Sequence, residues 1–161
     1  MDEAVVYSAD EAASVTFRFS DAEHGYTVGL AARQARLEMG TDLRWKPLST
    51  FFGSIATDWR GWEGERELTA MKELSDYGPP AFRLTASNDG GGHTTVVAEL
   101  GSPYLGTNLS KEGHDTHVGF AVPTQSGAWS LRVVLLLESW QLDGIAADIS
   151  ALTPTADRGL W

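Results

Sequence analysis

The segment 82–100 constrains the fold more than any other part of the sequence, because it has the pattern of two strands joined by a short turn. Phe82, Leu84 and Ala86 alternate with polar residues, which is typical of a strand with one buried face. Asn88-Asp-Gly-Gly-Gly92 then supplies the residues that tight hairpins prefer, and His93 to Leu100 returns. A short turn predicts antiparallel pairing, since parallel strands need a long crossover.

Further strands are expected on both sides of this hairpin. Val15, Phe17 and Phe19 alternate with polar residues, and the segment 26–39 continues as an extended stretch after a turn at 21–25. Two more strands are expected over 116–122 and 128–138. The part 131–137 is apolar on both faces, so we expect it to lie at the centre of the sheet.

Two helices complete the predicted fold. Pro47 precedes a run with helical spacing, Leu48, Phe51, Phe52, Ile55, which indicates a short helix near 48–58. A second apolar stripe predicts a C-terminal helix near 140–152, which Pro154 stops. The fold class is therefore α+β, an antiparallel sheet of about six strands with both helices packed on one face. We expect a single domain, 1–161, with loosely ordered tails at 1–12 and 155–161.

Charge and composition exclude several classes of protein. The net charge is −10, from 22 Asp and Glu against 12 Lys and Arg, and a field of that sign repels the phosphate backbone, so no nucleic acid is expected as a partner. No apolar run approaches the roughly 20 residues of a membrane helix, so no membrane partner is expected. There is no cysteine, which is compatible with a reducing compartment, and a cytoplasmic location is expected.

No convincing active site is present in the sequence. Glycine–serine nucleophile motifs, an activatable cysteine and zinc-protease motifs are missing, so we expect no catalytic residues and no cofactor. His114, Asp115 and His117 form the one tight cluster of metal-ligand types. On an extended strand the two histidines would face opposite sides, and further ligands are missing nearby, so a metal site is not expected there.

Tryptophan is abundant, with six in the chain. Trp59 and Trp62 lie in a glycine-rich stretch together with Glu63 and Glu65, and tryptophan is favoured where proteins contact one another. We therefore predict these four residues as partner-binding. Trp140, by contrast, is expected to be in the core.

Three blocks of the sequence carry a resemblance. They are Trp59-x-Gly61-Trp62-x-Gly64-x-Arg66, then Phe82-x-Leu84-x-Ala86-x-x-Asp89-x-x-Gly92-His93, then Val133-x-Leu135-x-Leu137-Glu138-x-x-Gln141-Leu142-x-x-Ile145-Ala146. With these blocks the chain resembles a family of uncharacterised small actinobacterial proteins over roughly residues 15–150, and this resemblance implies no catalytic role. In general character the chain is also similar to immunity proteins of bacterial toxin systems, which implies a toxin as partner.

The leading hypothesis is a non-catalytic, acidic protein-binding module, in one version an immunity-type inhibitor of a basic toxin or enzyme. One alternative is a small-ligand or metal-dependent enzyme or binder that uses the loop with His114 and His117. Another is a structural subunit of a larger assembly. These alternatives stay open at this point.

Overall fold

The computed structural model describes residues 2–21, 25–71, 81–102 and 129–152. Over these ranges it contains eight strands and two helices. In chain order they are β1 (Glu3–Tyr7), β2 (Ala13–Asp21), β3 (Gly25–Ala32), β4 (Ala35–Gly40), α1 (Trp45–Thr57), β5 (Arg66–Ala70), β6 (Phe82–Asn88), β7 (His93–Ser102), β8 (Trp129–Glu138) and α2 (Ser139–Ala151).

The strands form two antiparallel sheets of four, in the orders β1-β2-β3-β4 and β5-β6-β7-β8, which corrects the expected single sheet of about six strands. Helix α1 stands between the two groups in the sequence, so each sheet is built from its own run of hairpins. The α+β mixture and the antiparallel pairing are confirmed. Hairpin signals identify which neighbours pair, but they do not say where one sheet ends and the next begins.

Two strands of the first sheet differ from expectation. β1 lies within the segment 1–12 that was expected to be a loosely ordered tail, and it pairs with β2 from Glu3↔Arg18 to Tyr7↔Ser14. Only Ala4 and Val6 of β1 face the core, so the alternating pattern is too short to predict a strand. The long stretch expected over 26–39 is a hairpin, because the chain turns at Arg33 with φ of +37°.

β8 ends the described part of its sheet instead of lying at its centre. Val133, Leu135 and Leu137 are buried, whereas Val134 and Leu136 on the opposite face are 48% and 50% exposed. The strand predicted over 116–122 lies outside the described residues. Within the described residues, β8 therefore leaves the apolar side chains of one of its faces exposed.

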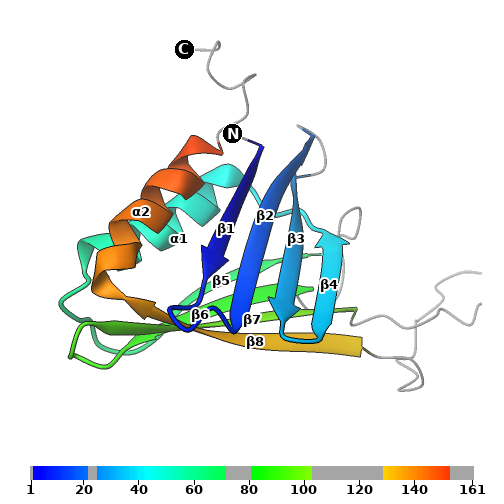
Figure 1. Cartoon of the computed structure of the whole chain (residues 1–161). Coiled ribbons are helices and arrows are strands. Elements are labelled where there is room, and N and C mark those ends of the chain that lie inside the picture. Colours follow the sequence, from blue (N-terminus) through cyan, green and yellow to red (C-terminus); the bar gives the residue numbers. More distant parts are fainter. Residues whose placement is uncertain (1, 22–24, 72–80, 103–128, 153–161) are drawn as a thin grey trace, which may run out of the picture.

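The two sheets cross steeply, and the helices close the side where the sheets diverge (Figure 1). α1 and α2 pack against each other, with α1 also touching β5 and α2 touching β8 and β1. Phe17 of β2 lies at the meeting point, with ring centroids 6.0 Å from Phe52 of α1 and 6.1 Å from Phe82 of β6. One hydrophobic core is therefore shared by both sheets and the helices.

Both predicted helices are confirmed, with shifted ends. α1 begins at Trp45, so Pro47 stands in its first turn, where a missing N–H group costs nothing. α2 is capped by Glu138, not by Ser139, in a capping box with Gln141. The buried phenol of Tyr26 donates to the carbonyl of Leu152 at 3.0 Å, which fixes the end of α2 against β3.

Hydrogen bonds join the two sheets at two places. At the first, Ala9 N–H donates to the Leu136 carbonyl at 2.8 Å, and Leu136 N–H donates to Ser8 Oγ at 3.1 Å. At the second, Asp42 N–H donates to the Met71 carbonyl at 3.1 Å, and Met71 N–H donates to Asp42 Oδ1 at 2.7 Å. The relative position of the sheets is therefore set by polar contacts as well as by the core.

Candidate functional site

The loop between α1 and β5 contains the residues that the sequence singled out. Asp58 at its start bonds to the guanidinium of Arg66, the first residue of β5, so the loop is closed at its base. Gly61 has φ of +131°, which favours glycine, and a side chain there would meet Asn88. The Asn88 amide in turn donates to the Trp59 carbonyl at 3.4 Å, which holds the loop against the β6–β7 hairpin.

The two tryptophans of this loop have different surroundings. Trp59 is 38% exposed, and the guanidinium of Arg60 lies over its ring at 4.6 Å. Trp62 is half-buried against the core and is covered by the Arg66 guanidinium at 4.4 Å. Both cation–π contacts order the rings. Trp59 is thus the more exposed of the two rings.

The carboxylates of Glu63 and Glu65 are exposed next to these tryptophans. Neither forms an ion pair with another residue in the described part of the chain. Within the described residues these two carboxylates therefore have no counter-charge, and the sequence predicts that a partner supplies it. That interaction stays a prediction.

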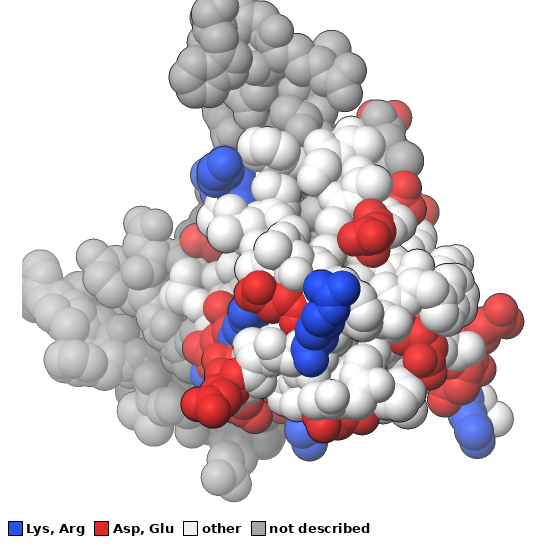
Figure 2. Space-filling model, turned by 90° about the vertical axis from the view of Figure 1, so that its left-hand side faces the viewer, with Lys and Arg blue, Asp and Glu red and all other residues white. Residues whose placement is uncertain are grey.

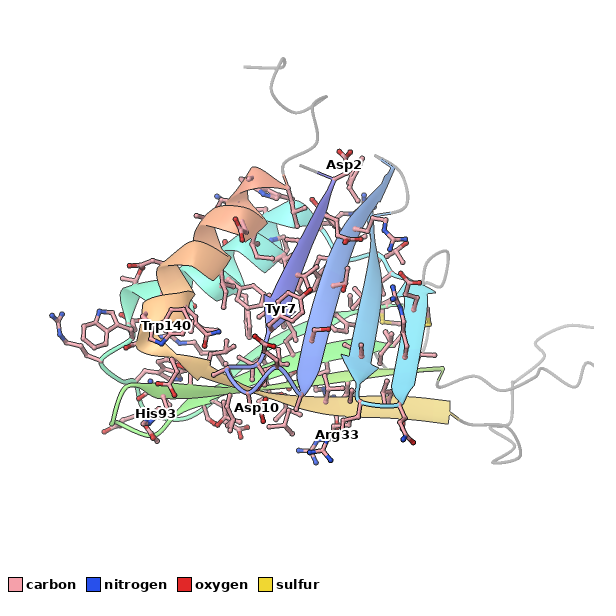
Figure 3. All side chains as sticks on the ribbon, in the orientation of Figure 1. Asp2, Tyr7, Asp10, Arg33, His93 and Trp140 are labelled. Atoms are coloured by element: carbon pink, nitrogen blue, oxygen red, sulfur yellow. The ribbon has the colours of Figure 1, made fainter. Side chains whose placement is uncertain are left out.

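Trp140 is the most exposed large apolar residue of the described chain, at 78%, although we expected it in the core. It follows the capping residue of α2 and projects away from the helix (Figure 3). The signal that could have placed it outside is the helical stripe itself. Leu142 and Ile149 face inward, and position 140 is two residues before that stripe, on another side of the helix.

The β6–β7 hairpin connects the loop to the start of α2. His93 Nδ1 lies 2.8 Å from Asp89 Oδ2, and His93 Nε2 lies 3.5 Å from Glu138 Oε2. The bond with Asp89 and the charge of Glu138 raise the pKa of His93. Hydrogen bonds from the Gly91 N–H and from His93 lower the pKa of Asp89.

Trp59 and Trp140 therefore occupy one end of the molecule, on either side of this hairpin. We call the set Trp59, Arg60, Glu63, Glu65 and Trp140 the aromatic end. Figure 2 looks onto the helix side of the molecule, where acidic groups are scattered among uncharged surface and outnumber basic ones.

A groove of about 510 Å³ runs between α1 and β5, next to this loop. Its walls are mostly apolar and include Phe51 and Leu68. Arg66 also lines it, and the buried Nη1 group of Arg66 has no hydrogen-bond partner in the part of the chain that the structure describes. The full lining is Lys46, Pro47, Thr50, Phe51, Ser54, Arg66, Glu67 and Leu68.

The metal-ligand candidates His114, Asp115 and His117 lie outside the described residues. Within 2–21, 25–71, 81–102 and 129–152, no three His, Cys, Asp or Glu side chains come together in a way that could hold a metal ion. Neither of the two described helices has the length and apolar character needed to cross a bilayer.

Comparison with known proteins gives a family but no activity. No curated protein matches the chain, and no solved structure matches it. The model of a family of unknown function, DUF6228, matches residues 7–106, from the end of β1 past β7. This match includes the loop and the groove and stops before β8 and Trp140. It covers more than half of the 161 residues, and the protein therefore belongs to the DUF6228 family of unknown function.

Proposed function

We propose that the protein is a non-catalytic protein-binding module and that the aromatic end is its contact surface. The observation that carries this proposal is the exposure of Trp140, whose side chain is 78% accessible at the start of a well-capped helix. A large apolar ring held in water by a rigid element gains most when a partner covers it.

The surroundings of Trp140 suit this role. Trp59 presents a second ring at the same end, already ordered by Arg60 at 4.6 Å, so little side-chain entropy is lost when it is covered. Energetically dominant interface residues are typically tryptophan, tyrosine and arginine, surrounded by polar groups that exclude water. Glu63 and Glu65 supply such polar groups beside the rings.

The charge of the chain gives the class of partner that we propose. A net charge of −10 attracts a basic protein and raises the rate of encounter with it. In the more specific version of the proposal the partner is a basic toxin or enzyme, and this protein is an immunity-type inhibitor that covers its active site. A cytoplasmic location is part of this proposal.

The proposal is tested by affinity capture from the native host with the wild-type chain and with Trp140→Ala as bait. We expect a basic protein that is captured by the wild type and, once purified, binds it with defined stoichiometry. Trp140→Ala should weaken this complex by about 2 kcal/mol or more, the cost of removing a dominant contact.

Tyr7→Ala is the matched control, because Tyr7 is also an exposed aromatic residue, at 56%, but belongs to β1 of the first sheet and not to the elements that carry the aromatic end. It should leave the affinity unchanged. Capture of no specific protein, or equal losses for the two variants, would contradict the proposal. For the inhibitor version, the purified partner must lose its toxicity or enzymatic activity when this protein is added.

A further inference from the structure

We propose that the groove between α1 and β5 holds an extended segment of the partner protein, which adds to the free edge of β5 and places one apolar side chain in the groove. This inference rests on the proposed function, since it says how part of the partner is held. The groove does not include the two rings of the aromatic end, but it lies next to the carboxylates Glu63 and Glu65 of that surface.

The outer edge of β5 has backbone groups without a hydrogen-bond partner among the described residues. Met71, just after the strand, points its N–H and C=O away from β6, because both bond to Asp42. The Ala70 carbonyl points the other way and accepts from Ala81 N–H at 2.9 Å. Backbone groups alternate in direction along a strand, so those of Thr69 and Glu67 point outward like those of Met71. No described residue bonds to these outward groups.

The edge and the groove lie together. Glu67 and Leu68 of β5 line the groove on one side, and Thr50 and Phe51 of α1 line it on the other. A volume of about 510 Å³ is within the range of about 300–1,000 Å³ found for ligand pockets. A strand edge beside an apolar groove is the arrangement in which a peptide gains main-chain hydrogen bonds from the edge and specificity from a side-chain pocket.

Arg66 gives the groove one rigid wall. Its guanidinium is fixed by Asp58 and lies over the ring of Trp62 at 4.4 Å. Little side-chain entropy is therefore lost at this wall when a segment lies against it.

The charge around the groove selects the kind of segment. The loop that carries Glu63 and Glu65 leads directly into β5 at Arg66, and these two carboxylates have no ion-pair partner in the described chain. The basic residues in the lining of the groove are Arg66, which is paired with Asp58, and Lys46. We therefore commit to a segment of the partner with one large apolar side chain and basic residues beside it, in extended conformation.

The test uses a phage-displayed library of random peptides and the full chain. We expect enriched peptides that pair an apolar residue with neighbouring lysine or arginine. A synthetic peptide of the strongest clone should shift the amide NMR signals of Glu67 and Thr69 and slow the hydrogen exchange of both. In the free protein these two amides should exchange quickly.

Two tryptophan substitutions provide the matched comparison. Thr50→Trp on the exposed face of α1 fills the groove and should weaken peptide binding by at least about tenfold. Ala147→Trp puts the same side chain on the exposed face of α2, away from the groove, and should change the affinity by less than about twofold.

Three results would overturn the inference: a library that yields no saturable binder, a peptide whose shifts map elsewhere, or equal effects of the two substitutions. Slow exchange of Glu67 and Thr69 in the free protein would also overturn it, because it would mean that this chain fills its own groove. A native complex that survives Thr50→Trp but loses affinity with Trp140→Ala would leave the proposed function intact and reject only the groove. Loss of affinity with both variants would support both surfaces. Loss of affinity with Thr50→Trp alone would support the groove and reject the aromatic end.

Discussion

The two sheets differ in how many of their exposed charged, apolar and backbone groups find a partner within the described protein. On the β1–β4 sheet, Arg18 donates to Glu3 and to Glu38 at 3.0 Å each, so one guanidinium connects β1, β2 and β4. Gly29 of β3 makes this possible, because a side chain there would come within 3.1 Å of the Glu38 side chain that crosses it. On the β5–β8 sheet, Val134 and Leu136 are half-exposed, and the edge of β5 has backbone groups that no residue in the described ranges pairs with.

This difference indicates where an interaction surface belongs. Single exposed apolar residues are normal, but neighbouring ones beside unpaired edges are the features that partners cover. The first sheet joins three strands through one guanidinium, whereas the second sheet has the separate pairs Arg83–Glu67 and Arg132–Glu99. Within the described residues, the second sheet and the loop that leads into it also leave rings, two carboxylates and part of a strand edge without partners. We therefore expect substitutions on the first sheet to act on stability and those around the second to act on binding.

The largest effect should come from the core that both sheets share. Phe17 is fully buried between Phe52 and Phe82, so Phe17→Ala leaves a cavity at the junction of three layers. We expect a loss of about 3–5 kcal/mol in the free energy of unfolding, measured by urea denaturation. If the sheets form one cooperative unit, signals from both should change at the same denaturant concentration.

Val134→Ala is the control for that experiment, because Val134 lies on the open face of β8 and is 48% exposed. It should cost no more than about 0.5 kcal/mol. Two separate transitions in the Phe17 variant would show that the sheets unfold independently, and the comparison of their faces would then concern two domains.

A smaller effect is expected at the polar joint between the sheets. Ser8 is 2% exposed, and its Oγ accepts from Leu136 N–H at 3.1 Å. Ser8→Ala leaves that N–H without its acceptor and should cost about 1–2 kcal/mol in thermal or chemical unfolding. Hydrogen exchange of the Leu136 amide should speed up. Ser14→Ala, on the outer face of β2, is the control and should be nearly neutral.

Much of the fold follows from local patterns in the sequence. The hairpin around Asp89-Gly90 and both helices were predictable because turn residues and helical stripes act over a few neighbours. The division into two sheets was not, because it depends on contacts between segments far apart, such as Ser8 with Leu136. The same reason explains β8, whose two apolar faces predicted a central strand.

The candidate site was predictable only in part. The loop with Trp59 and Glu65 stood out through its tryptophans and glycines. Trp140 was misplaced, because an apolar residue at the start of a helical run resembles a core residue unless its offset of two positions from the stripe at Leu142 is taken into account. The groove could not be predicted either, because it is formed by the distance between α1 and β5 and not by any motif.

A still smaller effect on stability is expected when one exposed charged contact is removed from each sheet. Arg18→Met breaks bonds to two carboxylates, whereas Arg83→Met on β6 removes one long contact of 3.7 Å with Glu67. Arg18→Met should lower the melting temperature more than Arg83→Met, and the difference should shrink in high salt, which screens exposed charges. Equal melting temperatures for the two variants would mean that the network of the first sheet contributes no more than an isolated pair.

The smallest predicted effect is a pH dependence that only the second sheet should show near neutrality. In the second sheet, His93 pairs with Asp89 at the β6–β7 hairpin. In the first sheet, the turn between β1 and β2 contains Asp10, whose pKa is lowered by hydrogen bonds from Ser8 and Ala12. Because the pKa of His93 is raised in the folded state, its contribution is fully present below the unfolded pKa of about 6.5 and is lost as pH rises through the folded value.

The carboxylates behave in the opposite sense. The pKa values of Asp89 and Asp10 are lowered by folding, so their contributions are present above the unfolded pKa of about 3.9 and are lost only as pH falls through the folded values. The difference in unfolding free energy between wild type and His93→Gln should therefore decrease as pH rises above about 6.5. Asp10→Asn should show no such change in that window. If His93→Gln follows the wild type at every pH, the contact of His93 with Asp89 and Glu138 does not persist in solution, and the hairpin is not tied to the start of α2 in the way that the aromatic end requires.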